Sequence, residues 1–161
     1  MPVPAMRPSA IAVYVFRQTP ACELLQIRRS AKARGHAGLW QTVYGGVEPD
    51  PSGLAGQETA IAAALRELRE EIGLSPIRMF QVEYVETFYF RPTDVVLHMP
   101  VFAVEVDPAA GVRLNEEHDA ARWISEVEIP DKFMWRTQRE ALAILLDHLR
   151  QILTGPLVWA P

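Results

Sequence analysis

The stretch Gly45–Leu74, GGVEPDPSGLAGQETAIAAALRELREEIGL, decides how the rest of the chain is arranged. Its second part predicts a helix over Thr59–Ile72, because Ala and Leu dominate there and no Gly or Pro interrupts. Gly73 suits the end of this helix, since glycine adopts a left-handed cap readily. Apolar residues recur at the spacing of one buried helix face, and they are Ile61, Ala64, Leu65, Leu68 and Ile72.

Three acidic residues near the end of this helix form an unusual cluster. Glu70 and Glu71 lie three and four positions after Glu67, so the three carboxylates share one flank and repel each other. The negative end of the helix dipole adds a second penalty, and each costs roughly 0.3–1 kcal/mol. A hard cation such as Mg²⁺ would reverse both effects, because carboxylate oxygens bind it. The alternative is a solvated charged face, softened by Arg66 and Arg69.

The wider pattern resembles the signature of the Nudix hydrolases. Glu58, seven intervening residues and then Arg66–Leu74 match that signature throughout. The family glycine six residues before Glu58 is replaced by Ser52. We interpret Pro49–Leu54 as an insertion of about six residues in a loop, a setting that Pro and Gly favour. Gly45 and Gly46 would then open the motif.

The resemblance implies a magnesium site, with manganese as the other candidate metal. Its expected ligands are Glu67, Glu70, Glu71, the Gly46 carbonyl and Glu117. The general base would be Glu67 or Glu117, both of which stay open. Glu58 and Arg66 are expected to be structural and to lock the loop onto the helix, since arginine pairs with carboxylates through paired hydrogen bonds.

A late acidic loop, Asn115–Asp119, supplies Glu117 in this interpretation, with Glu116 as the reserve. His118 is interpreted as a local hydrogen-bonding residue. The remaining expected substrate contacts are Arg28, Arg29, Gln41, Tyr44 and Trp135. The arginine pair suits phosphate oxygens, and its alternative role is solubility at a strand end. Trp135 either walls a base pocket or packs in the core.

Strands and a second helix are expected outside the motif. The extended segments are Ala10–Phe16, Glu23–Ile27, Leu39–Tyr44, Met79–Phe90, Val95–Val106 and Ala121–Ile124, and the helix is Thr137–Leu153. These residues alone support an α/β or α+β fold. The resemblance implies an α/β/α sandwich, with a mixed sheet between the motif helix and the C-terminal helix. We expect one domain over residues 1–161, with an arm at 1–9 and a tail at 154–161.

Composition narrows the function further. The chain has 161 residues and a net charge of −4, which argues against a broad nucleic-acid surface but not against a small phosphorylated ligand. Cys22 is the single cysteine, so no intramolecular disulfide is possible. No long apolar span or signal-like start occurs, so we expect a cytoplasmic protein without membrane contact. A homodimer is plausible by family analogy.

Shorter segments are similar to bacterial dihydroneopterin triphosphate pyrophosphatases, a group also described as dATP pyrophosphohydrolase-like. They are Arg7-Pro8, Leu39–Val43, Glu117-His118 with Trp123, and Trp135 with Arg139–Ala141. The expected reaction is hydrolysis of a phosphoanhydride in dATP or dihydroneopterin triphosphate, with release of pyrophosphate. Dinucleoside polyphosphates, nucleotide sugars and oxidised nucleotides stay open as substrates, and so does ligand binding without hydrolysis.

Overall fold

The computed structural model describes residues 6–33, 36–49, 58–133 and 135–154. The first part of the predicted arm, the predicted insertion from Asp50 onward and the tail beyond Thr154 lie outside these residues. The strands are β1 (Ala10–Gln18), β2 (Cys22–Arg29), β3 (Trp40–Gln41), β4 (Val43–Gly46), β5 (Arg78–Phe90), β6 (Val95–Glu105) and β7 (His118–Ser125). The helices are α1 (Ala60–Ile72), α2 (Ile129–Lys132) and α3 (Arg136–Thr154), with 3₁₀ turns at Arg91–Thr93 and Glu126–Glu128.

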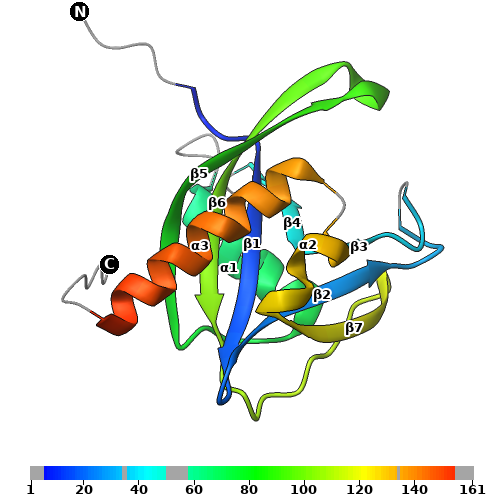
Figure 1. Ribbon diagram of the computed structural model, residues 1–161. Coiled ribbons are helices and arrows are strands. Elements are labelled where there is room, and N and C mark those ends of the chain that lie inside the picture. The colour runs from blue at the N-terminus through cyan, green and yellow to red at the C-terminus, as the bar shows by residue number, and fades with distance from the viewer. Residues whose placement is uncertain (1–5, 34–35, 50–57, 134, 155–161) are drawn as a thin grey trace, which may run out of the picture.

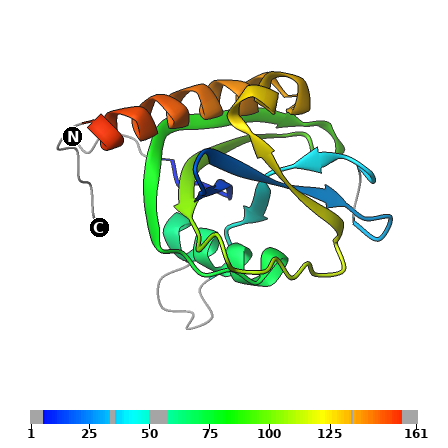
Figure 2. The same cartoon turned by 60° about the horizontal axis from the view of Figure 1, so that its bottom comes forward.

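The strands of the described residues form one mixed sheet. Its path is β3-β2-β1-β6-β5, while β4 pairs with β1 and β7 with β2. Strand β1 is parallel to β6 and antiparallel to its other partners. Helices α1 and α3 cover opposite faces of the sheet, as Figures 1 and 2 show. The predicted α/β/α sandwich is therefore confirmed.

Each face of the sheet has its own apolar core, because residues along a strand alternate between the faces. On the α1 side, Val13 and Val15 pack with Leu68 and Ile72. On the α3 side, Ala12, Tyr14 and Phe16 pack against the helix, with Leu142 and Leu145 among their neighbours. None of the described helices is both long enough and apolar enough to span a membrane.

The motif helix begins and ends as its sequence indicates. Thr59 is the N-cap and its hydroxyl accepts from the Ala62 amide at 3.1 Å, while Gly73 is left-handed at the other end. The predicted buried face is wrong at Ile61, which is 54% exposed. Its place is taken by Ala63 and, at the other end, by Glu71. The face is rotated because α1 packs with the flank that carries Glu71 toward the sheet.

Two further elements differ from the sequence-based expectation. Strand β7 begins at His118, three residues earlier than predicted, because His118 pairs with Arg29 of β2. The predicted acidic loop is therefore shorter and ends at Glu117. The segment that leads into α3 contains the short helix α2, which we had not predicted.

Candidate active site

The three acidic side chains of α1 differ sharply in exposure. The Glu70 side chain is 56% exposed and that of Glu67 is 13% exposed. Glu71 is buried, with 4% exposure for the whole residue. Residues three or four positions apart lie on the same side of a helix. Within that side, Glu70 lies nearest the solvent and Glu71 nearest the sheet. The cluster therefore reaches from open solvent into the protein.

Arg66 connects this cluster to the end of β4. Its guanidinium donates to Glu58 Oε1 at 2.6 Å, to Glu67 Oε1 at 2.8 Å and to Glu70 Oε2 at 3.2 Å. It also donates to the Gly46 carbonyl at 2.8 Å. The hydrogen bonds from Arg66 lower the pKa of Glu58. Glu58 and Arg66 thus lie in contact, and the same arginine touches three of the predicted metal-binding groups, namely Glu67, Glu70 and the Gly46 carbonyl.

Gly45 lies directly against Glu67. A Cβ atom added at Gly45 would lie 2.1 Å from Glu67 Cγ, far inside a van der Waals contact. The absence of a side chain at Gly45 therefore allows Glu67 to lie across β4. At Gly46 an added Cβ would meet no atom within 4 Å.

Glu71 carries the strongest electrostatic perturbation in this cluster. Burial first, and then the charges of Glu67 and Glu117, raise the pKa of Glu71 to about 9, while the charge of Arg29 opposes them. Its Oε2 atom is buried and has no hydrogen-bond partner among the described residues. Burial is also the largest cause of the raised pKa of Glu67. A buried carboxylate oxygen without a partner costs free energy unless a proton or a cation satisfies it.

The late loop docks beside the C-terminal end of α1. The Asn115 amide donates to the Glu71 carbonyl at 3.2 Å, and the Ser30 amide donates to the Glu117 carbonyl at 2.8 Å. The Glu117 side chain is exposed. His118 is buried, its Nδ1 atom lies 3.1 Å from Asn115 Oδ1, and its Nε2 atom has no partner among the described residues. Burial, followed by the charge of Arg29, lowers the pKa of His118 to about 4.

These residues fit a divalent cation. Among the described residues, no three His, Cys, Asp or Glu side chains already converge in a geometry that would hold a metal ion. The unpartnered Glu71 oxygen and the repulsion among the neighbouring carboxylates nevertheless provide what a hard cation requires, namely oxygen donors with excess negative charge. A cation here would satisfy the buried oxygen and cancel the repulsion.

The two predicted phosphate-binding arginines face different surroundings. Arg28 Nε donates to Asp119 Oδ1 at 2.7 Å, and its guanidinium lies 5.7 Å from the Trp40 ring centroid. Arg29 lowers the pKa of Glu71 through its charge, so it lies on the side of the acidic cluster. Neighbouring residues on a strand point to opposite faces, which explains the separation. The geometry favours Arg29 over Arg28 as a phosphate contact.

Gln41, Tyr44 and Trp135, predicted as substrate contacts, line one pocket of about 260 Å³. Gly45 also lines it, so the pocket adjoins the acidic cluster. Phe88 and Trp135 meet edge to face in its wall, with ring centroids 5.4 Å apart. Phe133, two residues before Trp135 in the chain, is 1% exposed and belongs to the core.

The sequence analysis missed the β5 side of this pocket, which is lined by Glu86, Phe88 and Phe90. These residues are two positions apart along β5, so their side chains lie on the same face of the strand. One signal was therefore available in the sequence: an acidic residue shares a strand face with aromatic residues. The sequence did not show that this face turns toward Gln41 and Tyr44.

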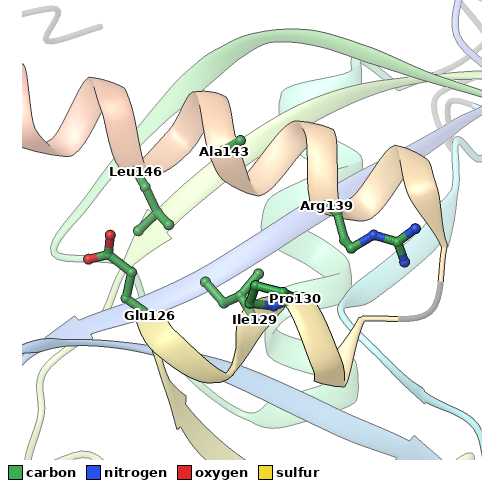
Figure 3. A pocket seen from close by; sticks show the side chains of 6 residues that line it. All are labelled: Glu126, Ile129, Pro130, Arg139, Ala143 and Leu146. Carbon is green, nitrogen blue, oxygen red and sulfur yellow. The ribbon is translucent and has the colours of Figure 1, made fainter.

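A second hollow, of about 210 Å³, lies between α2 and α3 (Figure 3). Ile129, Pro130, Ala143 and Leu146 line it. Its charged side chains already have protein partners, since Glu126 pairs with Arg150 and Arg139 donates to the Phe133 carbonyl at 2.7 Å. We assign no role to this hollow.

Comparison with known proteins gives a consistent result. Residues 6–145 match the NUDIX domain family. The chain is 36% identical over 142 residues to the octanoyltransferase of Myxococcus xanthus; the match covers 86% of this chain but only 36% of that longer protein.

Solved structures share the fold. The C. elegans Ap4A hydrolase in a binary complex aligns with a TM-score of 0.69 and 19% identity, over 88% of this chain and 96% of that chain. The MutT protein of Methanosarcina mazei aligns with a TM-score of 0.64 and 25% identity, over 92% of this chain and 100% of that chain.

Proposed function

The chain belongs to the Nudix family of hydrolases, and we propose that it hydrolyses a phosphoanhydride bond in a nucleoside triphosphate-like substrate and releases pyrophosphate. Members of this family generally use divalent metal ions and bind nucleotide-like small molecules. One observation carries the proposal: the buried Glu71 oxygen lies near other carboxylates and has no hydrogen-bond partner among the described residues. Gly45 lies against Glu67 of this cluster and also lines a pocket of a size suited to a ring. The substrates that we propose are dATP and dihydroneopterin triphosphate.

The metal-binding residues in this proposal are Glu67, Glu70, Glu71, the Gly46 carbonyl and Glu117. Mg²⁺, or Mn²⁺, would polarise phosphoryl oxygens and lower the pKa of a bound water. The Gly46 carbonyl has two lone pairs, so it can keep its hydrogen bond from Arg66 and still contribute an oxygen. Arg66 balances the negative charge of this region and fixes Glu67 and Glu70 toward β4.

Residues of the chain then complete the reaction. Water attacks a phosphorus atom, the bridging P–O bond breaks and pyrophosphate departs. Glu67 or Glu117 accepts the proton of the attacking water. The raised pKa of Glu67 brings this carboxylate closer to neutral pH, as a general base requires. Arg29 neutralises charge on the phosphates, while Gln41, Tyr44 and Trp135 hold the ring.

The group attached to the diphosphate is the least constrained part of this proposal. Dinucleoside polyphosphates, nucleotide sugars and oxidised nucleotides are the alternative substrates. The structural likeness to an Ap4A hydrolase, at 19% identity, concerns the fold and does not select among them. A domain that binds ligands without hydrolysis is the remaining alternative, and the complete set of acidic residues in the motif speaks against it.

The test is metal-dependent release of pyrophosphate, with the organic product identified, from a panel of dATP, other nucleoside triphosphates, dihydroneopterin triphosphate, diadenosine polyphosphates and ADP-ribose. We expect Glu70→Gln to lower turnover by orders of magnitude without unfolding, because Glu70 is exposed. Glu83→Gln is the matched control, since Glu83 is an exposed glutamate on β5. Wild-type turnover in Glu70→Gln would remove the metal-site proposal.

A further inference from the structure

A buried polar network lies beneath the aromatic pocket. Glu86 of β5 is 1% exposed, and among the described residues three hydroxyls donate to it. Tyr14 donates to Oε1 at 2.5 Å, while Tyr44 and Thr137 donate to Oε2 at 2.9 and 3.3 Å. The network therefore joins β1, β4, β5 and the start of α3 around one carboxylate. Such networks rigidify a site when their members are satisfied.

The carboxylate of Glu86 retains room for one more donor. An ionised carboxylate offers about four acceptor positions, and the described hydroxyls fill three of them, two on Oε2 and one on Oε1. Glu86 also lines the pocket. One acceptor position of this carboxylate, on Oε1, is thus left without a donor among the described residues.

Gln41 presents the complementary group in the same pocket. Gln41 is 6% exposed, and its Nε2 donor is buried without a partner among the described residues. An unpaired buried donor costs free energy, which an acceptor on a bound ligand would recover. The pocket thus combines an acceptor on Glu86 with a donor on Gln41, both enclosed by aromatic walls.

The geometry points to Glu86 and Gln41 as the pair that selects the substrate: the pocket takes a flat heteroaromatic ring whose edge carries an N–H donor beside an acceptor. This inference rests on the function proposed above and specifies the group attached to the diphosphate. Adenine, guanine and pterin rings present such an edge, whereas the sugar of a nucleotide sugar does not. Glu86 is then a specificity residue that touches the substrate away from the reacting phosphorus.

The shape of the pocket supports a ring rather than a larger group. Its volume of about 260 Å³ lies below the roughly 300–1,000 Å³ of pockets that enclose a whole drug-sized ligand. Phe88 and Trp135 supply aromatic surface, on which a flat ring packs favourably. Gly45 borders both the pocket and Glu67, so a ring held here places its phosphates toward the acidic cluster.

Nucleoside binding tests the inference without metal or hydrolysis. We expect calorimetric titration of the full chain to show that adenosine or guanosine binds at least about 10-fold more tightly than purine riboside, whose base has ring acceptors but no N–H donor. Glu86→Gln should reduce that ratio to less than about 3-fold. Glu140→Gln is the matched control and should keep the wild-type ratio. Glu140 accepts from the Tyr84 hydroxyl at 2.6 Å on the same β5–α3 contact, outside the pocket.

Kinetics with ATP or GTP against purine riboside triphosphate separate this inference from the proposed function. A site built around a hydrogen bond should favour the donor-bearing base by at least about 100-fold in kcat/KM, and Glu86→Gln should lose this preference mainly through KM. Hydrolysis with equal kcat/KM for both bases would overturn the ring inference and leave the proposed function intact. Donor-dependent nucleoside binding without hydrolysis of any triphosphate would overturn the proposed function alone. Equal nucleoside binding by wild type and Glu86→Gln would overturn the role of Glu86 in either case.

Discussion

Glu71 and Glu86 are both buried glutamates, but their surroundings differ in kind. Burial is the largest cause of the raised pKa of each carboxyl group. Around Glu86, hydroxyl groups of three different elements donate to the carboxylate and lower its pKa against that effect. Around Glu71, other carboxylates raise the pKa further, and Oε2 has no partner among the described residues.

The difference shows two ways in which a protein accommodates a buried acid. Glu86 is stabilised within the folded chain, so its position is fixed before any ligand arrives. Glu71 is left with unfavourable electrostatics, which a proton or a metal ion relieves. The first arrangement suits recognition of a ring edge, and the second suits a metal site that is completed by its ligand.

The largest effect is expected at Gly45, which lies against Glu67 of the acidic cluster and also lines the pocket that contains Glu86. Gly45→Ala would force Glu67 away from β4, because the new Cβ would lie 2.1 Å from Glu67 Cγ. We expect kcat to fall by about 100-fold or more, because displacement of a catalytic group by about 1 Å costs this much. Steady-state kinetics with the best substrate of the panel would measure the loss.

Gly46→Ala is the matched comparison for this glycine. An added Cβ there meets no atom within 4 Å, so we expect a far smaller loss of kcat. Equal losses in the two variants would show that general strain in β4, and not the position of Glu67, limits the reaction.

Most of the fold was predictable, because local signals specify its elements. The predicted helix over Thr59–Ile72 and its stop at Gly73 agree with α1 to within one residue, and the resemblance to a known family gave the layers. The buried face of α1 was not predictable, since apolar residues occur on two sides of the helix and only packing on the sheet selects one of them. Ile61 is exposed for this reason, while Glu71 is buried.

Residue spacing alone predicted only those parts of the candidate site that are close in sequence, whereas the family resemblance pointed to Gln41, Tyr44 and Trp135, which line one pocket. The acidic cluster follows from helical spacing, and the resemblance to the family motif implied the Glu58–Arg66 contact. Glu86 escaped prediction because its partners, Tyr14, Tyr44 and Thr137, are distant in sequence and meet only in the folded chain. The strand position of His118 also escaped prediction, because it depends on pairing with Arg29, which is distant in sequence.

The next largest effect concerns the stability of the metal-free protein as pH changes. The Glu71 carboxyl has a pKa of about 9 in the folded protein and an ordinary value of 4.5 when unfolded. Between these values the folded state binds a proton that the unfolded state lacks, so stability is lost as pH rises, by up to about 1.4 kcal/mol per unit. Glu71→Gln removes this dependence.

Thermal unfolding in a metal chelator at pH 6 and pH 8 would measure the effect. When the pH is raised from 6 to 8, we expect the Tm of the wild type to fall by roughly 5–10 °C more than the Tm of Glu71→Gln. Mg²⁺ should then raise the Tm of the wild type more than that of the variant. Parallel pH curves for the two proteins would show that Glu71 is ionised and satisfied without a metal.

Glu86→Gln should behave in the opposite way to Glu71→Gln and destabilise the protein. The glutamine amide cannot accept all three hydroxyl donors, so we expect a loss of about 1–3 kcal/mol in urea unfolding. Glu140→Gln, on the same β5–α3 contact but partly exposed, should cost much less, because solvent screens an exposed carboxylate. A stabilised Glu86→Gln would mean that Glu86, like Glu71, awaits a cation.

The smallest expected effect is at His118, at the start of β7. Burial lowers the pKa of His118 to about 4, against an ordinary value of 6.5, so the wild type loses stability as pH falls through this window. His118→Gln removes that loss. When the pH falls from 6.5 to 5.5, the free energy of unfolding of the wild type should therefore drop by about 1 kcal/mol more than that of the variant. Urea unfolding at both pH values measures the gain, and the imidazole NMR signals report the protonation directly. An imidazole that titrates near 6.5 would contradict this prediction, because water would then reach His118 and folding would leave its pKa unchanged.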